Sequence, residues 1–175
     1  MTTTTEPKTT EANAAETNPA GIKRPHLVFA LGGDDYVVAI AHVRELIAAA
    51  PLTTLPGAPP WVRGIFNLRG AVVPLVDLGV KLGVGSSAAT LRTSWMLVEL
   101  VVEHRRELVA VEAEEVRAIV EIADVELLET PAIGIRIERD CVRGVVPYGD
   151  GFGLVLDLER VLTGEASAQK PGASR

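Results

Sequence analysis

Much of the fold of this chain can be inferred from the stretch VRGIFNLRGAVVPLVDL, from Val62 to Leu78. It places the four residues NLRG (67–70) between two apolar segments. A second stretch, VRGVVPYGDGFGLVLDL, runs from 142 to 158 with the same opening and the same close, but its turn has no arginine. The chain is therefore predicted to consist of two related halves, and only one of them carries an arginine in its turn.

Apolar runs broken by turn residues predict the elements of the first half. HLVFAL and YVVAI, at 26–31 and 36–40, are expected to form a hairpin around a Gly/Asp turn. The spacing of Val43, Leu46 and Ile47 predicts a helix over 41–50, with these three residues on one face. Four prolines make 51–60 a connector.

The repeated stretches are predicted to be pairs of strands, each followed by a short helix. Asp77 and Asp157 stand in equivalent places, after an apolar strand and before a leucine, which is the pattern of a helix N-cap. A further hairpin is expected within 94–113, preceded by a Gly/Ser/Thr loop at 83–93.

About five short strands in each half predict a mainly β fold of two small, pseudo-duplicated barrels. Two halves this small are marginal alone, so they are expected to share a core. That core must be aliphatic, because apolar residues make up 47% of the chain and aromatic residues only 4%. Residues 26–163 are expected to form the domain, between a disordered tail at 1–25 and a flexible tail at 164–175.

Composition excludes several classes of function. Ten acidic residues against three arginines lie in 99–129, and no basic face with stacking aromatics is visible, which argues against nucleic-acid binding. The acidic residues alternate with Val, Leu and Ile, as on the solvated side of strands. The N-terminus has no apolar signal segment and no run is long enough to cross a membrane, so a cytoplasmic protein without membrane insertion is expected.

No catalytic or metal-binding constellation is apparent. The three histidines and the single cysteine, Cys141, have no ligand spacing, so neither metal nor cofactor is expected. Asp77 and Asp157 would suit a shared aspartic dyad, but such a dyad needs Asp-Thr/Ser-Gly in an exposed loop, and capping is favoured. A β-barrel hydrolase or ligand-binding protein that uses these aspartates is kept as a minor alternative.

The residues 37–46, 59–78 and 141–162 together resemble the CheW-like domain of chemotaxis coupling proteins. The motif G-x-x-N-L-R-G-x-x-x-P-x-x-D-L stands unbroken from Gly64 to Leu78, and the resemblance covers about 26–163. It implies two intertwined five-stranded SH3-like barrels around a common apolar core.

The resemblance also implies a function without catalysis. Such proteins are adaptors that link the cytoplasmic tips of methyl-accepting chemoreceptors to the regulatory domain of a CheA-type histidine kinase, in arrays at the membrane. The receptor-binding groove of the family would map onto Glu45 and Arg69, which are expected to pair, with Val43 and Gly64 beside them and Val116 at a less well matched position. The same adaptor role in twitching, gliding or gene regulation is the main alternative.

Overall fold

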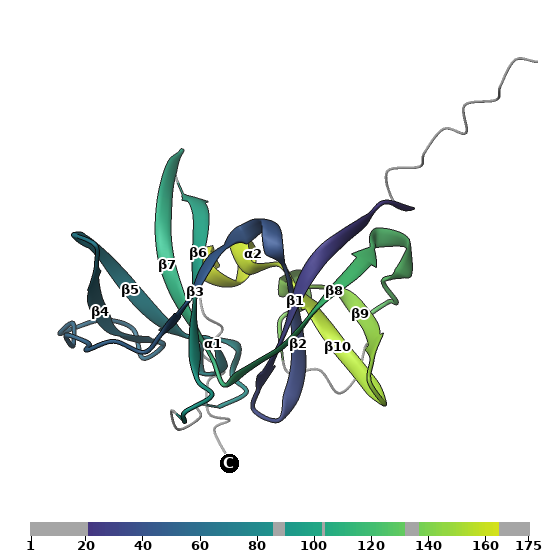
Figure 1. Ribbon diagram of the computed structural model, residues 1–175, viewed down its shortest axis with the longest axis horizontal. Helices are drawn as coiled ribbons and strands as arrows, with labels where there is room; N and C mark the ends of the chain where they lie inside the picture. Colours follow the sequence, from purple (N-terminus) through teal and green to yellow (C-terminus); the bar gives the residue numbers. More distant parts are fainter. Residues whose placement is uncertain (1–20, 86–89, 103, 132–136, 165–175) are drawn as a thin grey trace, which may run out of the picture.

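Two five-stranded sheets lie side by side in the computed structural model, which describes residues 21–85, 90–102, 104–131 and 137–164 (Figure 1). The first sheet has the order β8-β1-β2-β10-β9 and the second the order β3-β6-β7-β5-β4. The strands are β1 (Lys23–Leu31), β2 (Asp34–Ala39), β3 (Val43–Ala48), β4 (Val62–Leu68), β5 (Ala71–Asp77), β6 (Ser94–Val102), β7 (Arg105–Ala113), β8 (Glu115–Ala123), β9 (Val142–Tyr148) and β10 (Gly151–Leu156). The helices are α1 (Leu78–Leu82), α2 (Leu158–Thr163) and the short 3-10 turns η2 (Ile40–His42), η3 (Asp124–Glu126) and η4 (Arg139–Cys141).

The two halves of the sequence are intertwined. The hairpin β1–β2 comes from the first half but shares a sheet with β8, β9 and β10 of the second, pairing with β8 and β10, while β6–β7 shares a sheet with β3, β4 and β5 of the first, pairing with β3 and β5. Replacing each strand by its counterpart in the other half converts one strand order into the other. In each sheet a parallel pair of strands joins the two halves, β10 with β2 in the first sheet and β5 with β7 in the second. The expected mainly β fold of two intertwined five-stranded units is confirmed.

Each sheet is closed by a single bridge at equivalent places. Thr53 pairs with Ile65 beside β4, and Leu128 pairs with Val145 in β9. The backbone carbonyl of Trp61 accepts from Asp77 N at 2.8 Å, and that of Cys141 accepts from Asp157 N at 2.9 Å. The sequence repeat is therefore a repeat of backbone geometry.

Both repeated aspartates cap the helix that follows them. The Oδ1 atom of Asp77 accepts from Val80 N at 3.0 Å, and that of Asp157 accepts from Arg160 N at 3.1 Å. In each case the side chain satisfies one of the backbone donors that a helix leaves unpaired at its first turn.

The helix expected over 41–50 is wrong, because this stretch forms the edge strand β3 after the short turn η2. Burial alternates along β3, so Val43 and Ile47 face inward while Leu46 is 45% exposed. Apolar residues at 43, 46 and 47 suit a helical face, but pairing with β6 satisfies the backbone here and overrides that local pattern.

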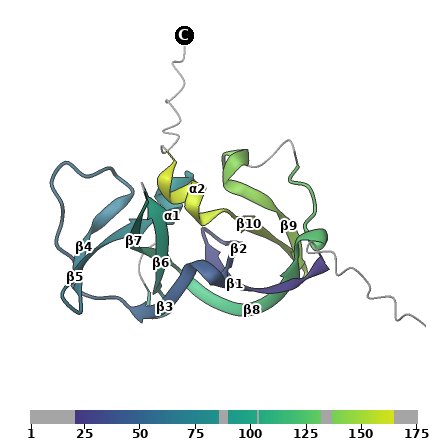
Figure 2. The ribbon, with the colours of Figure 1, turned by 90° about the horizontal axis from the view of Figure 1, so that it is seen from above.

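The core has one shared part and one part in each sheet. Phe29, Tyr36, Leu78, Met96 and Leu158 belong to a central cluster built from both sheets and both helices, which lie between the sheets (Figure 2). Smaller clusters fill the individual sheets, around Phe66 and Trp95 in one and around Val28, Val37 and Val155 in the other. This shared core explains how two halves of such small size stabilise each other.

Lys81 ties the two short helices together inside this core. Its side chain is 7% exposed, and its Nζ atom donates to the carbonyl oxygen of Gly164, at the end of α2, at 3.1 Å. The same ammonium lies 3.7 Å from the ring centroid of Trp61, a cation–π contact. Burial lowers the pKa of Lys81.

The expected tails lie mostly outside the described residues, as does part of the loop at 83–93. β1 already begins at Lys23, ahead of the expected domain start at 26. Within the described ranges, no helix combines the length and apolar character that a membrane crossing requires.

Candidate functional site

Arg69 occupies an unusual backbone conformation in the two-residue turn between β4 and β5. Its φ is +51°, and that of Gly70 is +92°. Positive φ at both turn positions matches the twist of the flanking strands, but the first position normally takes Asn, Asp or Gly. A side chain there costs about 1–2 kcal/mol. The equivalent turn of the second half has Gly149, with φ +56°, so the first half retains an arginine that the turn does not favour.

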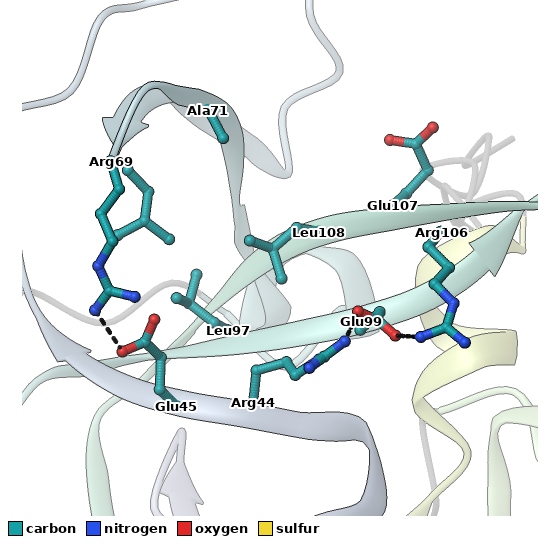
Figure 3. A pocket seen from close by; sticks show the side chains of 10 residues that line it. Arg44, Glu45, Arg69, Ala71, Leu97, Glu99, Arg106, Glu107 and Leu108 are labelled. Atoms are coloured by element: carbon teal, nitrogen blue, oxygen red, sulfur yellow. Dashed lines mark hydrogen bonds and ion pairs between the residues drawn. The ribbon is translucent and has the colours of Figure 1, made fainter.

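The side chain of Arg69 reaches across to the edge strand β3. Its Nη2 atom donates to Oε2 of Glu45 at 3.0 Å (Figure 3). Asn67 fixes the turn below it, because its Oδ1 accepts from Gly70 N at 2.9 Å. The guanidinium is 76% exposed and the carboxylate 35% exposed, so the pair is available to a partner and contributes only about 0–1 kcal/mol to stability.

This pair stands on the rim of a surface pocket of about 540 Å³, here called the Arg69 pocket. Its apolar lining consists of Leu68, Ala71, Leu97 and Leu108. Its charged lining consists of Arg44, Glu45, Arg69, Glu99, Arg106 and Glu107. Leu97 belongs to the core cluster of this sheet, and Leu68 and Leu108 pack against it, so the apolar lining is held by the core itself. Such a surface can hold an aliphatic side chain and orient it through the charges around it.

A second charged group lies on the same rim. Glu99 of β6 bonds to Arg44 of β3 through one carboxylate oxygen and to Arg106 of β7 through the other, the latter at 3.0 Å (Figure 3). The hydrogen bond from Arg44, with the charge of both arginines, lowers the pKa of Glu99. This three-residue bridge was not predicted from the sequence, since its members come from three strands and share no local motif.

Of the five expected groove residues, the structure brings only Glu45 and Arg69 together. Val43 and Val116 both pack against the central core cluster, at equivalent places in β3 and β8, and neither lines the Arg69 pocket. Gly64 is buried, with φ +151°, and a Cβ there would lie 2.5 Å from the carbonyl oxygen of Thr53. Its glycine is required by close backbone packing.

The equivalent edge strands β3 and β8 each carry an arginine at a bulge. The register shifts between Val43 and Glu45 and, in the other sheet, between Val28 and Phe29, which leaves Arg44 and Arg117 as the extra residues. Arg117 pairs with Asp35 at 3.2 Å, away from the Arg69 pocket. Bulges turn side chains out of the regular ladder, and here each one presents an arginine at the surface.

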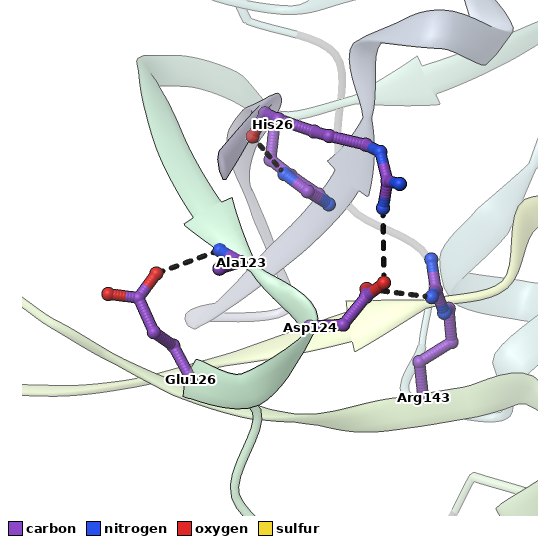
Figure 4. A network of polar contacts seen from close by, with 6 residues as sticks. His26, Ala123, Asp124, Glu126 and Arg143 are labelled. Carbon is purple, nitrogen blue, oxygen red and sulfur yellow. Dashed lines mark hydrogen bonds and ion pairs between the residues drawn. The ribbon is translucent and has the colours of Figure 1, made fainter. Parts of the chain in front are cut away.

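The described acidic residues of 99–129 are distributed over β6, β7, β8, η3 and the residues that flank them, and several pair with basic residues of other strands. Asp124 binds Arg24 at 3.0 Å and Arg143 at 3.1 Å, while Glu126 accepts from the backbone of Ala123 (Figure 4). In the same network, the ring Nδ1 of His26 lies 2.8 Å from the carbonyl oxygen of Arg24.

The carboxylates of the repeated aspartates are bound by neighbouring groups of the protein itself. Beyond its cap, Asp77 lies 3.6 Å from Arg63, which also binds Glu112 at 3.1 Å. Burial raises the pKa of Glu112, and Arg63 opposes that shift. Among the described residues, no group of three or more His, Cys, Asp or Glu side chains is placed to hold a metal ion.

Comparison with known proteins points to one family. The family model of the CheW-like domain matches residues 25–166. The chain is 32% identical over 142 residues to the chemotaxis protein CheW of Rhizobium meliloti, which covers 81% of this chain and 89% of that protein. A probable chemotaxis protein CheW of Rhizobium etli is 31% identical over 140 residues, covering 80% and 88%. A shorter match, 34% identical over 71 residues, covers 41% of the chain and 40% of protein PilI of Pseudomonas aeruginosa.

A solved structure shares the fold. The scaffolding protein TtCheW of Thermoanaerobacter tengcongensis superposes with a TM-score of 0.72 at 21% identity, covering 89% of this chain and 98% of that one. At this identity the superposition establishes the fold alone.

Proposed function

The chain belongs to the CheW-like domain family, and from that premise we propose that it is a non-enzymatic adaptor that couples transmembrane chemoreceptors to a CheA-type histidine kinase. The proposed partners are the cytoplasmic tip of the receptor and the regulatory domain of the kinase. The adaptor would act in the cytoplasm, at receptor arrays. Residues 26–163 are the proposed functional unit, which β1 extends at its start to Lys23.

One observation gives the strongest support for a binding role at the Arg69 pocket. Arg69 is held at positive φ in a turn whose counterpart uses glycine, and its side chain lies over an apolar surface beside Glu45. Backbone strain that folding does not require points to a functional demand on the residue. We therefore assign the receptor tip to this pocket.

The receptor tip is a helical hairpin in the proposed partner family, which suits the shape of the site. A helix in a groove is bound through apolar anchors and oriented by a few polar groups. The leucines of the Arg69 pocket supply the apolar contact, and the Arg69–Glu45 pair supplies the orientation. Of the other expected groove residues, Val43 would act by shaping β3 beside the pocket, whereas Val116 lies in β8 of the other sheet and has no part in this site.

A titration tests this proposal. The full chain is titrated with a receptor-tip fragment and, separately, with the regulatory domain of a CheA-type kinase from the same genome. Both partners are expected to bind. Arg69→Ala is expected to weaken binding of the receptor tip and to leave binding of the kinase domain unchanged. Absence of binding to both partners would contradict the adaptor role.

The same adaptor role in a pathway for twitching, gliding or gene regulation is the second candidate. The match to PilI, over less than half of the chain, is the observation that keeps it open. The two CheW relatives match over four fifths of the chain, which favours chemotaxis. Genes for flagellar or for other chemosensory components beside this one would distinguish the two pathways.

A further inference from the structure

The charges around the Arg69 pocket are unevenly distributed. At one end, Arg69 and Glu45 neutralise each other. At the other end, the carboxylate of Glu99 is shared by two guanidinium groups, so the cluster of Arg44, Glu99 and Arg106 carries one positive charge in excess, while the full lining, with Glu107, has three arginines and three glutamates. Glu107 extends from the opposite side of β7 to Arg106 and makes no ion pair within the described residues (Figure 3).

Both arginines of this end are accessible. The side chain of Arg106 is 75% exposed and that of Arg44 is 56% exposed, whereas the carboxylate between them is 26% exposed. The positive end therefore faces outward on a protein whose formal net charge is −6. A carboxylate brought by a partner would meet two guanidinium donors that are already held near each other, and such charge-assisted hydrogen bonds are about twice as strong as neutral ones.

We infer that Arg44 and Arg106 form an acceptor site for an acidic side chain of the receptor tip, with Glu99 as the internal carboxylate that holds this site in the free protein. The inference rests on the proposed function, since it assigns the Arg69 pocket to the receptor. The tip helix then presents an aliphatic side chain to the leucines and an Asp or Glu on the same helical face to the two arginines.

This arrangement predicts opposite effects for neighbouring substitutions. Replacing both arginines by glutamate places like charges against the partner's carboxylate, so binding of the receptor tip weakens about tenfold or more at low salt. Glu99→Gln removes the internal competitor and frees both guanidinium groups, so binding tightens by about two- to fivefold. If the bridge only stabilised the strands, Glu99→Gln would weaken binding or leave it unchanged.

The experiment measures the dissociation constant of a receptor-tip fragment at about 50 and 200 mM salt. It compares wild type, Arg44→Glu/Arg106→Glu, Glu99→Gln and Arg117→Glu. Arg117 is the matched control, since it stands in β8 at the bulge equivalent to that of Arg44 in β3, is ion-paired, and lies away from the pocket. Urea unfolding of each variant shows that the fold is retained.

The inference is supported if the double variant weakens binding and flattens its salt dependence, Glu99→Gln tightens binding, and Arg117→Glu stays within about twofold of wild type. It is overturned if the double variant binds the receptor tip as well as wild type does. It is also overturned if the double variant no longer binds the kinase domain but still binds the receptor tip. If wild type does not bind the tip at all, the proposed function fails first, and this inference fails with it.

Discussion

Gly64 is expected to be required for folding, and its replacement gives a quantitative test of how the repeat closes each sheet. In Gly64→Ala the new Cβ would lie 2.5 Å from the carbonyl oxygen of Thr53, at a φ of +151°. The backbone strain costs about 1–3 kcal/mol. Relief of the contact moves Thr53 away and weakens its two hydrogen bonds to Ile65, at 2.8 and 2.9 Å, which contribute about 1 kcal/mol each. If both hydrogen bonds are lost, the expected loss of unfolding free energy is about 3–5 kcal/mol.

Two other glycines separate these contributions. Gly57 has φ +77° and no atom within 4 Å of its Cβ position, so Gly57→Ala measures the cost of backbone conformation, about 1–2 kcal/mol. Gly144, the counterpart of Gly64, would place its Cβ 2.8 Å from the carbonyl oxygen of Leu128 without a positive φ, so Gly144→Ala measures the contact, about 1–3 kcal/mol.

Urea unfolding followed by tryptophan fluorescence suits these measurements, because Trp95 is 2% exposed and reports on the core of this sheet. The order of destabilisation should be Gly64→Ala above either of the other two. A loss below about 1 kcal/mol for Gly64→Ala would refute the argument from close packing. Gly64 would then be free to act at a binding surface, as the family resemblance implies.

Two further predictions concern stability. Asp157→Ala should lower the free energy of unfolding by about 1 kcal/mol, because a helix cap is lost. Asp77→Ala should cost more, because the side chain of Asp77 is only 5% exposed and also faces Arg63. Thermal unfolding compares the two variants, and equal losses would contradict the role of burial. Burial, with the charges of Asp34 and Glu114, raises the pKa of Tyr36 from 10.0 to about 12. Between these values the folded protein keeps a proton that the unfolded chain has lost, so stability falls as the pH rises through this window, by up to roughly 3 kcal/mol. Tyr36→Phe should lose less stability than wild type between about pH 9 and about pH 11 in urea titrations, and an unchanged pH dependence would show that Tyr36 is not responsible.

Much of the fold was predictable because it depends on residues that are close together in the sequence. Turn residues defined the hairpins, and the repeated aspartates defined both helix starts, because a cap depends on residues within one turn. The strand β3 was missed, since Val43, Leu46 and Ile47 fit a helical face and the pairing with β6 that decides the matter is not local. The intertwining of the halves followed only from the family resemblance.

The candidate site was predictable only in part. The Arg69–Glu45 pair came from the resemblance, and the geometry now shows it as an ion pair. The bridge of Glu99 to Arg44 and Arg106 had no signal in the sequence, because Arg44 and Glu99 are brought together by the pairing of strands that are far apart along the chain.

Reconstitution of receptor-dependent kinase activity tests both the coupling function and the role of Arg69 in it. Membranes with a chemoreceptor and a CheA-type kinase are supplied with wild type or with Arg69→Gly, which gives the first turn the glycine of the second. Because glycine accepts the positive φ of this turn, the free energy of unfolding should stay the same or rise by up to about 1 kcal/mol. Wild type should stimulate kinase autophosphorylation, and this stable variant should not. Equal stimulation by both proteins would contradict the role assigned to Arg69, and no stimulation by wild type would contradict coupling itself.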